Sequence, residues 1–350
     1  MVIAVDTGNR CMKTAHAEPF SAGLVNHYNI KPTMATDVLC YNGNYYSFSE
    51  TQGSQREDKT VDDYYYILTL AAIAREIVIK RALRNNPNVT EADFKKVMNE
   101  ANRAGASYIE DIYLSVGLPP RDMVSGGNVI HGEKSLPEKY KEYFGHNGDR
   151  VRFMYNNMSF DISVKEVFVL AQGFAAVFPD DIFSQVTKFP QTYIIDIGGY
   201  TTDIALIANR RIDLSFFESL DYGVIFLYST ISDVVARVTG KKNLNGILIE
   251  AVLRGESIGD AEVEKAVHTA ARYYASQIVS ALKDRKIDLE ISLPVLVGGG
   301  AHLLENELKE AMGRDDVVVL PDVRANAIGY ELFAEKMLKE RRRTTNNALL

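Results

Sequence analysis

Over the first fifty positions of the chain, apolar residues form both alternating and continuous short runs, a pattern that is typical of strands. Turn residues interrupt the pattern at Gly8, Gly23 and Asn42-Gly43, and this favours a meander of successive strands. The predicted strands cover residues 2–6, 12–17, 24–30 and 37–48.

From position 62 the period changes to about 3.6 residues, which predicts a long helix over 62–83. Thr90 and Asp93 have the spacing of a capping box, so a second helix is expected to begin there and to reach about residue 101. Pro179 is expected to end a helix over 166–178. The other predicted strands are 108–117, 151–155, 158–163, 293–297 and 316–320, with a hairpin over 192–217. The other predicted helices are 222–240, 245–253, 259–286, 301–312 and 324–342, with an irregular segment and a short helix in 121–150.

Two stretches of the chain resemble each other. VIAVDTGNRCMKTA near the N-terminus and YIIDIGGYTTDIAL at 193–206 both run from a strand through Asp, x, Gly into a polar turn and a second strand. Asp6 and Asp196 occupy the same place in the two stretches. Mixed strands and helices in two similar halves predict an α/β protein. We predict two domains, one formed by 1–163 with 325–350 and the other by 164–324.

Asp and Gly are costly inside a strand, because a buried carboxylate loses hydration and glycine weakens the strand. A glycine turn between strands can point backbone N–H groups at an anion and so form a phosphate-binding nest. Carboxylates suit Mg²⁺, which keeps several waters and is often held together with phosphate. Lys13 adds a positive charge, and Thr201 and Thr202 add hydroxyls. An ordinary hairpin turn explains either motif alone, whereas the matched pair favours a magnesium polyphosphate held between two domains.

A third motif is the buried strand at 293–297 followed by Gly298, Gly299 and Gly300 and then a helix. Three small residues at a helix N-terminus permit the close approach of a ligand. A tight strand-to-helix turn is the other interpretation. The chain contains neither G-x-G-x-x-G with a following acid nor G-x-x-x-x-G-K-[ST], which excludes the Rossmann and P-loop motifs.

Composition narrows the class of protein. Charged residues make up 24% and hydrophobic residues 46%, and no apolar run reaches the ~20 residues that a membrane span needs. The formal net charge of −7 argues against direct nucleic-acid binding. The two cysteines and the strand pattern at the N-terminus predict a cytoplasmic protein. The six histidines lack the spacing of a structural metal site.

Five motifs together resemble those of a known superfamily. DTGNRCMK, VLAQGFAAVF, DIGGYTTD, PVLVGGGAHLL and RANAIGYELFA are similar to the phosphate 1, connect 1, phosphate 2, adenosine and connect 2 motifs of the actin/Hsp70/sugar-kinase ATPases. Their order and spacing match across nearly the whole chain. DDYYYILTLAAIA at 62–74, YLSVGLPP at 113–120 and the chain length resemble the ParM-type plasmid-segregation actins.

This resemblance implies two α/β domains, each with an RNase-H-like core, and ATP with Mg²⁺ in the cleft between them; whether GTP can replace ATP stays open. It implies self-association into filaments with ATP, filament breakdown after hydrolysis, and plasmid DNA bound through an adaptor protein, with no direct nucleic-acid or membrane contact. Asp6 and Asp196 would organise Mg²⁺ through water. The expected nucleotide contacts are Thr7, Gly8, Asn9, Lys13, Gly198, Gly199, Tyr200, Thr201, Thr202, Gly223, Gly298, Gly299 and Gly300.

The residue that positions the attacking water is expected in connect 1. Gln172 stands where many bacterial relatives carry glutamate and eukaryotic actin carries glutamine. An amide can orient water, because phosphoryl transfer depends mainly on positioning and charge stabilisation. Glu166 is the rival; on one helix it would point about 240° away from Gln172. Two other functions stay open: a small-molecule kinase on the same fold, and a nucleotide-gated scaffold that does not hydrolyse.

Overall fold

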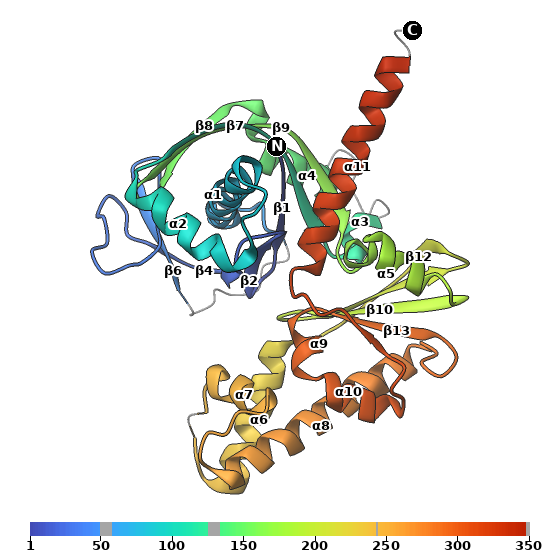
Figure 1. Cartoon of the computed structure of the whole chain (residues 1–350). Coiled ribbons are helices and arrows are strands. Elements are labelled where there is room, and N and C mark those ends of the chain that lie inside the picture. The colour runs from blue at the N-terminus through green and yellow to red at the C-terminus, as the bar shows by residue number, and fades with distance from the viewer. Residues whose placement is uncertain (50–57, 125–133, 243, 348–350) are drawn as a thin grey trace. The chain divides into compact units, whose positions relative to one another are not determined.

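A computed structural model describes residues 1–49, 58–124, 134–242 and 244–347 of the chain. The chain divides into two compact units, drawn in Figure 1. Unit 1 comprises Met1–Phe178 with Asn326–Leu350, and unit 2 comprises Pro179–Ala325. The first boundary therefore lies after Phe178 and not after residue 163, because one strand continues past 163 within unit 1. In the described ranges, no helix combines the length and the apolar character needed to cross a membrane.

Unit 1 contains a nine-stranded sheet that curves strongly. Its order is β3-β2-β1-β7-β9-β8-β5-β6-β4, so β3 and β4 lie at opposite ends of the sheet. They are consecutive in the chain and only Ala22 separates them, so the sheet must curl until its ends approach each other. The Phe20 and Phe48 rings, 5.1 Å apart, pack where this happens. The strands are β1 Val2–Thr7, β2 Cys11–Thr14, β3 Phe20–Ser21, β4 Gly23–Asn26, β5 Val38–Tyr41, β6 Asn44–Ser49, β7 Ser107–Leu118, β8 Arg150–Tyr155 and β9 Met158–Ala171.

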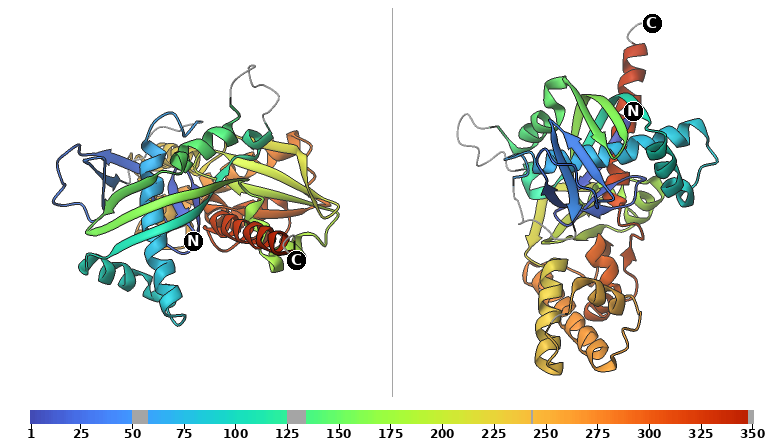
Figure 2. Two further views of the ribbon diagram at one scale, coloured as in Figure 1. Left: turned by 90° about the horizontal axis from the view of Figure 1, so that it is seen from above. Right: turned by 90° about the vertical axis from the view of Figure 1, so that its left-hand side faces the viewer.

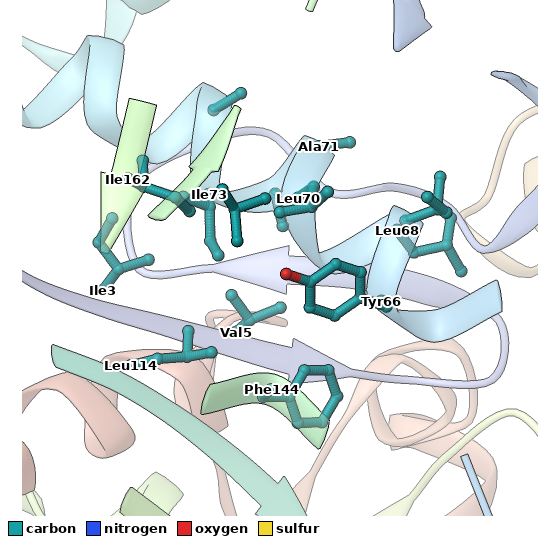
Figure 3. Packing of buried hydrophobic residues seen from close by; sticks show 14 of the residues in the cluster. Ile3, Val5, Tyr66, Leu68, Leu70, Ala71, Ile73, Leu114, Phe144 and Ile162 are labelled. Carbon is teal, nitrogen blue, oxygen red and sulfur yellow. The ribbon is translucent and has the colours of Figure 1, made fainter. Parts of the chain in front are cut away.

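The helix α1 (Tyr64–Asn85) lies inside this curved sheet (Figure 1). Its residues from Tyr65 to Ala74 are all buried, as expected for a helix that is covered on every side. Figure 3 shows Tyr66, Leu70 and Ile73 of α1 in one cluster with side chains of β1, β7 and β9. The other helical elements of unit 1 are η1 Glu91–Asp93, α2 Phe94–Arg103, α3 Pro120–Val124, α4 Leu136–Gly145, η2 His146–Gly148, η3 Ala175–Val177 and α11 Ala325–Asn347.

The long helix and the capping box predicted from the sequence are confirmed. Thr90 and Asp93 make both reciprocal capping hydrogen bonds. Within the irregular segment predicted over 121–150, the short helix is α4; residues 125–133 of that segment lie outside the described residues.

The helix predicted over 166–178 is wrong. The strand β9 continues to Ala171, pairs in parallel with β7, and is followed only by the short η3. A register shift beside Ile112 leaves Lys165 as an extra residue, and this bulge breaks the period-two pattern. Beyond it β9 is buried on both faces, because Val167 joins the α1 cluster while Phe168 packs with α11. A strand covered on both faces reads as a continuous apolar run, which periodicity cannot distinguish from a helix.

Unit 2 is built on a five-stranded sheet of order β12-β11-β10-β13-β14. Helices α6, α7, α8 and α10 gather on one face of this sheet, where their apolar side chains form a core with β10 and β11 (Figures 1 and 2). The helix predicted over 301–312 is divided at Leu304. The strands are β10 Gln191–Ile197, β11 Thr202–Ala208, β12 Arg211–Leu220, β13 Leu293–Val297 and β14 Val318–Val319. The helices are α5 Asp180–Val186, α6 Val224–Thr239, α7 Gly246–Leu253, α8 Ala261–Asp284, α9 Gly299–Leu303 and α10 Glu305–Met312.

The two sheets share a five-stranded plan. In unit 1 the order is β3-β2-β1-β7-β9. Strand β2 is antiparallel to β1, β7 is parallel to β1, and β9 is parallel to β7. In unit 2 the order β12-β11-β10-β13-β14 repeats the same directions. The repeat seen in the sequence is thus a repeat of topology, and it places Asp6 and Asp196 at the same point of each plan.

Candidate functional site

Three of the predicted residues meet at the end of β1 in unit 1. Asp6 is only 3% exposed, and its Oδ2 lies 3.3 Å from Nζ of Lys13, which is its partner across the β1–β2 pair. Gln172 follows β9 and donates from Nε2 to Oδ1 of Asp6 at 3.3 Å. Both carboxylate oxygens of Asp6 are therefore fixed, one by a cation and one by an amide.

The turn between β1 and β2 is tight and is attached to α1. A Cβ on Gly8 would lie 2.6 Å from the carbonyl oxygen of Cys11, so only glycine fits there. The hydroxyl of Tyr65 donates to Oδ1 of Asn9 at 2.6 Å. The buried Lys59 donates to the carbonyl oxygen of Thr7. Sequence reasoning missed both contacts, because Lys59 belongs to no recognisable motif and the helical pattern that contains Tyr65 does not indicate a partner for its hydroxyl.

The structure separates the two candidates for positioning water. Glu166 lies in β9, and its Oε2 pairs with Nη1 of Arg341 in α11 at 2.7 Å. Gln172 lies beyond the end of β9 and contacts Asp6, while the next residue, Gly173, donates its N–H to Oδ1 of Asn326 at 2.8 Å. The helical geometry used to compare the two residues was wrong, but Gln172 is the one beside the acidic turn.

In unit 2, Asp196 lies near the end of β10 and is followed by a glycine turn, as Asp6 lies near the end of β1 in unit 1. Asp196 is 9% exposed and lies opposite Asp203 in the β10–β11 pair. The N–H of Gly198 donates to the carbonyl oxygen of Thr201 at 2.8 Å and closes the turn. The Thr201 hydroxyl donates to Asp203 at 3.0 Å, and the buried Thr202 hydroxyl donates to the carbonyl oxygen of Tyr222. In this structure both hydroxyls stabilise the turn.

Gly223 joins this turn to the start of α6. A Cβ on Gly223 would lie 2.4 Å from the carbonyl carbon of Tyr200, so glycine is required for the contact. The N–H groups of Val224 and Ile225 donate to the carbonyl oxygens of Gly198 and Gly199 at 3.1 and 3.0 Å. Because these two carbonyl oxygens accept hydrogen bonds from the first turn of α6, the helix fixes the position of the glycine turn.

The glycine triad lies against Asp196. Gly298 has a φ of +92°, and a Cβ there would be 2.6 Å from Oδ1 of Asp196. A Cβ on Gly300 would be 2.3 Å from Cγ2 of the buried Ile197, whereas a Cβ on Gly299 would meet no atom within 4 Å. Gly298 and Gly300 therefore permit close packing, and only Gly299 borders open space.

The difference in space around Gly299 and Gly300 predicts that alanine at these two positions has different effects on stability. We expect Gly300→Ala to lower the free energy of unfolding by about 1–3 kcal/mol, because Ile197 has no room to move. We expect Gly299→Ala to leave it unchanged or to raise it by up to about 1 kcal/mol, because alanine favours a helix. Urea unfolding of both variants measures this. Equal destabilisation by the two would contradict the packing described above.

A second cluster of titratable groups lies in unit 1. His16, Glu76 and Glu331 have ligand atoms within 4.8 Å of one another and could hold a metal ion. However, Nδ1 of His16 is 2.5 Å from Oε1 of Glu76, and Nζ of Lys80 is 2.6 Å from Oε2 of Glu331. Two cations facing two carboxylates make a balanced buried ion network, which explains the cluster without a metal.

In this network the pKa values of His16 and Glu76 shift as ion pairing requires, whereas the pKa of Glu331 shifts in the direction set by its burial. The hydrogen bond to Glu76 raises the pKa of His16 above its ordinary value. Burial alone would raise the pKa of Glu76, but the hydrogen bond and charge of His16 bring it below its ordinary value. Burial raises the pKa of Glu331.

The His16 shift predicts a loss of stability at alkaline pH. A raised pKa in the folded state means that the His16–Glu76 pair contributes fully below the unfolded pKa of about 6.5, and that this contribution is lost as pH rises through the folded pKa. We expect His16→Gln to cost about 1–3 kcal/mol near pH 6 and progressively less toward pH 9. Urea unfolding of both proteins across this range measures it, and a difference that does not change with pH would contradict the prediction.

Comparison with known proteins agrees with this architecture. The family described as "Archaeal actin homologue MreB-like, C-terminal" matches residues 194–310. The apo ParM protein of psk41 has a similar structure, with a TM-score of 0.64 and 14% identity over 97% of this chain and 98% of that one. The chain has the actin-like fold. The predicted fold class is thereby confirmed, and the repeated five-stranded plan is the core that the resemblance led us to expect in each half.

Two further structures are similar to this actin-like chain. An archaeal actin homologue shares 17% identity, with a TM-score of 0.64, over 96% of this chain and 99% of its own; the same homologue is also known in complex with ADP. A subunit of a 15-stranded ParM filament from Clostridium botulinum shares 19% identity, with a TM-score of 0.64, over 96% of this chain and 99% of its own. No curated protein matches the chain by sequence.

Proposed function

We propose that this actin-like chain binds ATP with Mg²⁺, forms filaments in its ATP-bound state and hydrolyses the ATP, and that these filaments segregate plasmid DNA through an adaptor protein. The observation that carries the proposal is the matched pair of acid–glycine turns, each at the end of the first strand of one five-stranded plan. Similar proteins are known as filaments and, in one case, with ADP. GTP is the alternative nucleotide.

The chemistry of the residues fits a magnesium nucleotide. Asp6 and Asp196 supply hard oxygen ligands, and the Gly8 and Gly198 turns supply backbone that can approach phosphate. Gly299, which borders open space, would permit the close approach of the nucleoside. A bound Mg²⁺ would neutralise charge on the phosphates.

The chain's own residues then have separate tasks. Asp6 and Asp196 would hold the waters around the metal, and Lys13 would place a positive charge beside the phosphates. Gln172, fixed through its contact with Asp6, would orient the attacking water with its amide. Because an amide is not a strong base, we expect slow hydrolysis in isolated subunits.

Light scattering after ATP and Mg²⁺ are added to the purified chain tests this function. We expect scattering that rises and then decays as phosphate is released. Low, constant scattering with ADP formed only when a sugar is added would favour a small-molecule kinase. Scattering that persists without phosphate release would favour a nucleotide-gated scaffold. Cosedimentation with plasmid DNA, with and without a partition adaptor, tests the proposed indirect binding to DNA.

A further inference from the structure

The turn that carries Gln172 has an unusual backbone. Gly173 has a φ of +76°, and the N–H of Phe174 donates to the carbonyl oxygen of Gln172, two residues earlier, at 2.9 Å. A positive φ at the centre of such a hydrogen bond is the strained form of the γ-turn, which is rare. A strained conformation of this kind persists only where the surrounding structure holds it.

The peptide group between Gln172 and Gly173 is held at both ends. Its carbonyl oxygen accepts the hydrogen bond from Phe174, and its N–H donates to Oδ1 of Asn326 at 2.8 Å. Asn326 lies in the first turn of α11 and is only 5% exposed. Because a buried amide is costly unless it is hydrogen-bonded, the contact with Gly173 accounts for a polar side chain at this position.

Helix α11 meets this turn through a second residue on the same face. A Cβ on Gly329, three positions after Asn326, would lie 1.7 Å from the carbonyl oxygen of Ala175. Residues three apart are neighbours on one face of a helix, so Asn326 and Gly329 both lie against the segment 173–175. The close backbone contact at Gly329 keeps the Asn326 amide within reach of the Gly173 N–H.

The contact between Gln172 and Asp6 is a long one. Nε2 of Gln172 lies 3.3 Å from Oδ1 of Asp6, beyond the usual range of about 2.7–3.2 Å for an N–H···O hydrogen bond. The N–H of Gln172 donates to the carbonyl oxygen of Leu118 at 2.8 Å, which ties the residue to the end of β7. The peptide that follows Gln172 could still rotate, and the hydrogen bond to Asn326 opposes that rotation.

We propose that Asn326 is a positioning residue for ATP hydrolysis, and that it acts by holding the backbone at Gln172. By fixing the Gly173 N–H, it keeps the Gln172 amide at the place from which that amide orients the attacking water. This inference rests on the proposed function and adds to that site a residue from a distant part of the chain. Because catalysis by orientation depends closely on position, loss of this support should slow hydrolysis without weakening nucleotide binding.

The first test measures phosphate release by the purified full chain over a range of ATP concentrations with Mg²⁺. Asn326→Leu keeps the volume of the side chain and removes the acceptor, and we expect kcat to fall by about ten- to a hundredfold, as for Gln172→Ala. Calorimetry should give an ATP affinity within about threefold of wild type. Asn326→Asp keeps an acceptor for the Gly173 N–H and should hydrolyse ATP within about fivefold of the wild-type rate.

A double variant separates positioning from independent support. Because Asn326 acts through Gln172, adding Asn326→Leu to Gln172→Ala should slow hydrolysis by no more than about twofold beyond Gln172→Ala alone. Two independent contributions would instead multiply. Asn326→Ala also lacks the acceptor, and it carries both measurements if Asn326→Leu does not fold.

Glu331→Gln is the matched control in the same helix. Glu331 is buried, and its Oε2 lies 2.6 Å from Nζ of Lys80, so this variant disturbs α11 at another point and should hydrolyse ATP near the wild-type rate. Four results would overturn the inference: a control as slow as Asn326→Leu, a multiplied loss in the double variant, an ATP affinity that falls with the rate, or wild-type rates without the acceptor. Wild-type protein that releases no phosphate, or Gln172→Ala that hydrolyses normally, would instead overturn the proposed function, so the two failures can be told apart.

Discussion

Asp196→Ala is expected to abolish ATP hydrolysis, with a loss on the order of a thousandfold or more. Asp196 is the acid of the unit 2 turn, and its side chain packs against Gly298. In the proposed function, the metal and its waters would then lose one of their two organising groups. Phosphate release by the purified variant, under conditions in which the wild-type protein turns over, measures the effect.

Two further variants make this experiment decisive. Asp196→Asn keeps the volume against Gly298 and should also be inactive, which separates lost charge from lost packing. Asp203→Asn changes the acid that lies opposite Asp196. The carboxylate of Asp203 accepts hydrogen bonds from Thr201 and Ser219, and this variant should retain most of the activity. Phosphate release near the wild-type rate by Asp196→Ala would refute the assignment.

Gln172→Ala is expected to slow hydrolysis by about ten- to a hundredfold while assembly changes much less. The amide of Gln172 is fixed by Asp6, and its removal should leave the attacking water without orientation but the nucleotide bound. Filaments of the variant should therefore last longer. Phosphate release and light scattering, recorded on one sample, compare the two processes.

Glu166→Gln is the matched control for this variant. Glu166 lies in β9 and pairs with Arg341, so its loss should disturb an ion pair on the surface of unit 1 and leave hydrolysis near the wild-type rate. If Gln172→Ala lost assembly and hydrolysis equally, the residue would be structural. If Glu166→Gln were the slower enzyme, the roles of the two residues would have to be exchanged.

Elements with strong local signals could be predicted from the sequence. The helix over 62–83 has a long apolar pattern, and Thr90 with Asp93 forms the capping box that its spacing indicates. The two Asp-x-Gly turns could also be found, because a short hairpin is specified by neighbouring residues. For the same reason Asp6 was correctly placed opposite the return strand that carries Lys13.

Elements that depend on distant partners could not be predicted in this way. The segment after Val164 reads as a helix, yet it is a strand, because β7 supplies its hydrogen bonds and a bulge at Lys165 hides its period. Lys59 and the His16–Glu76–Glu331 network depend on contacts between segments far apart in the chain. No spacing in the sequence encodes them.

Sequence alone therefore determined the α/β class and the repeated acid–glycine turns, since the signals for both lie within a few neighbouring positions. Which residues face phosphate stays a prediction. Only the tertiary structure decided that Gln172 and not Glu166 lies beside Asp6, that Gly299 alone of its triad borders open space, and that Lys59 supports the first turn. The physical reason is that packing and strand pairing bring together groups that the order of the chain keeps apart.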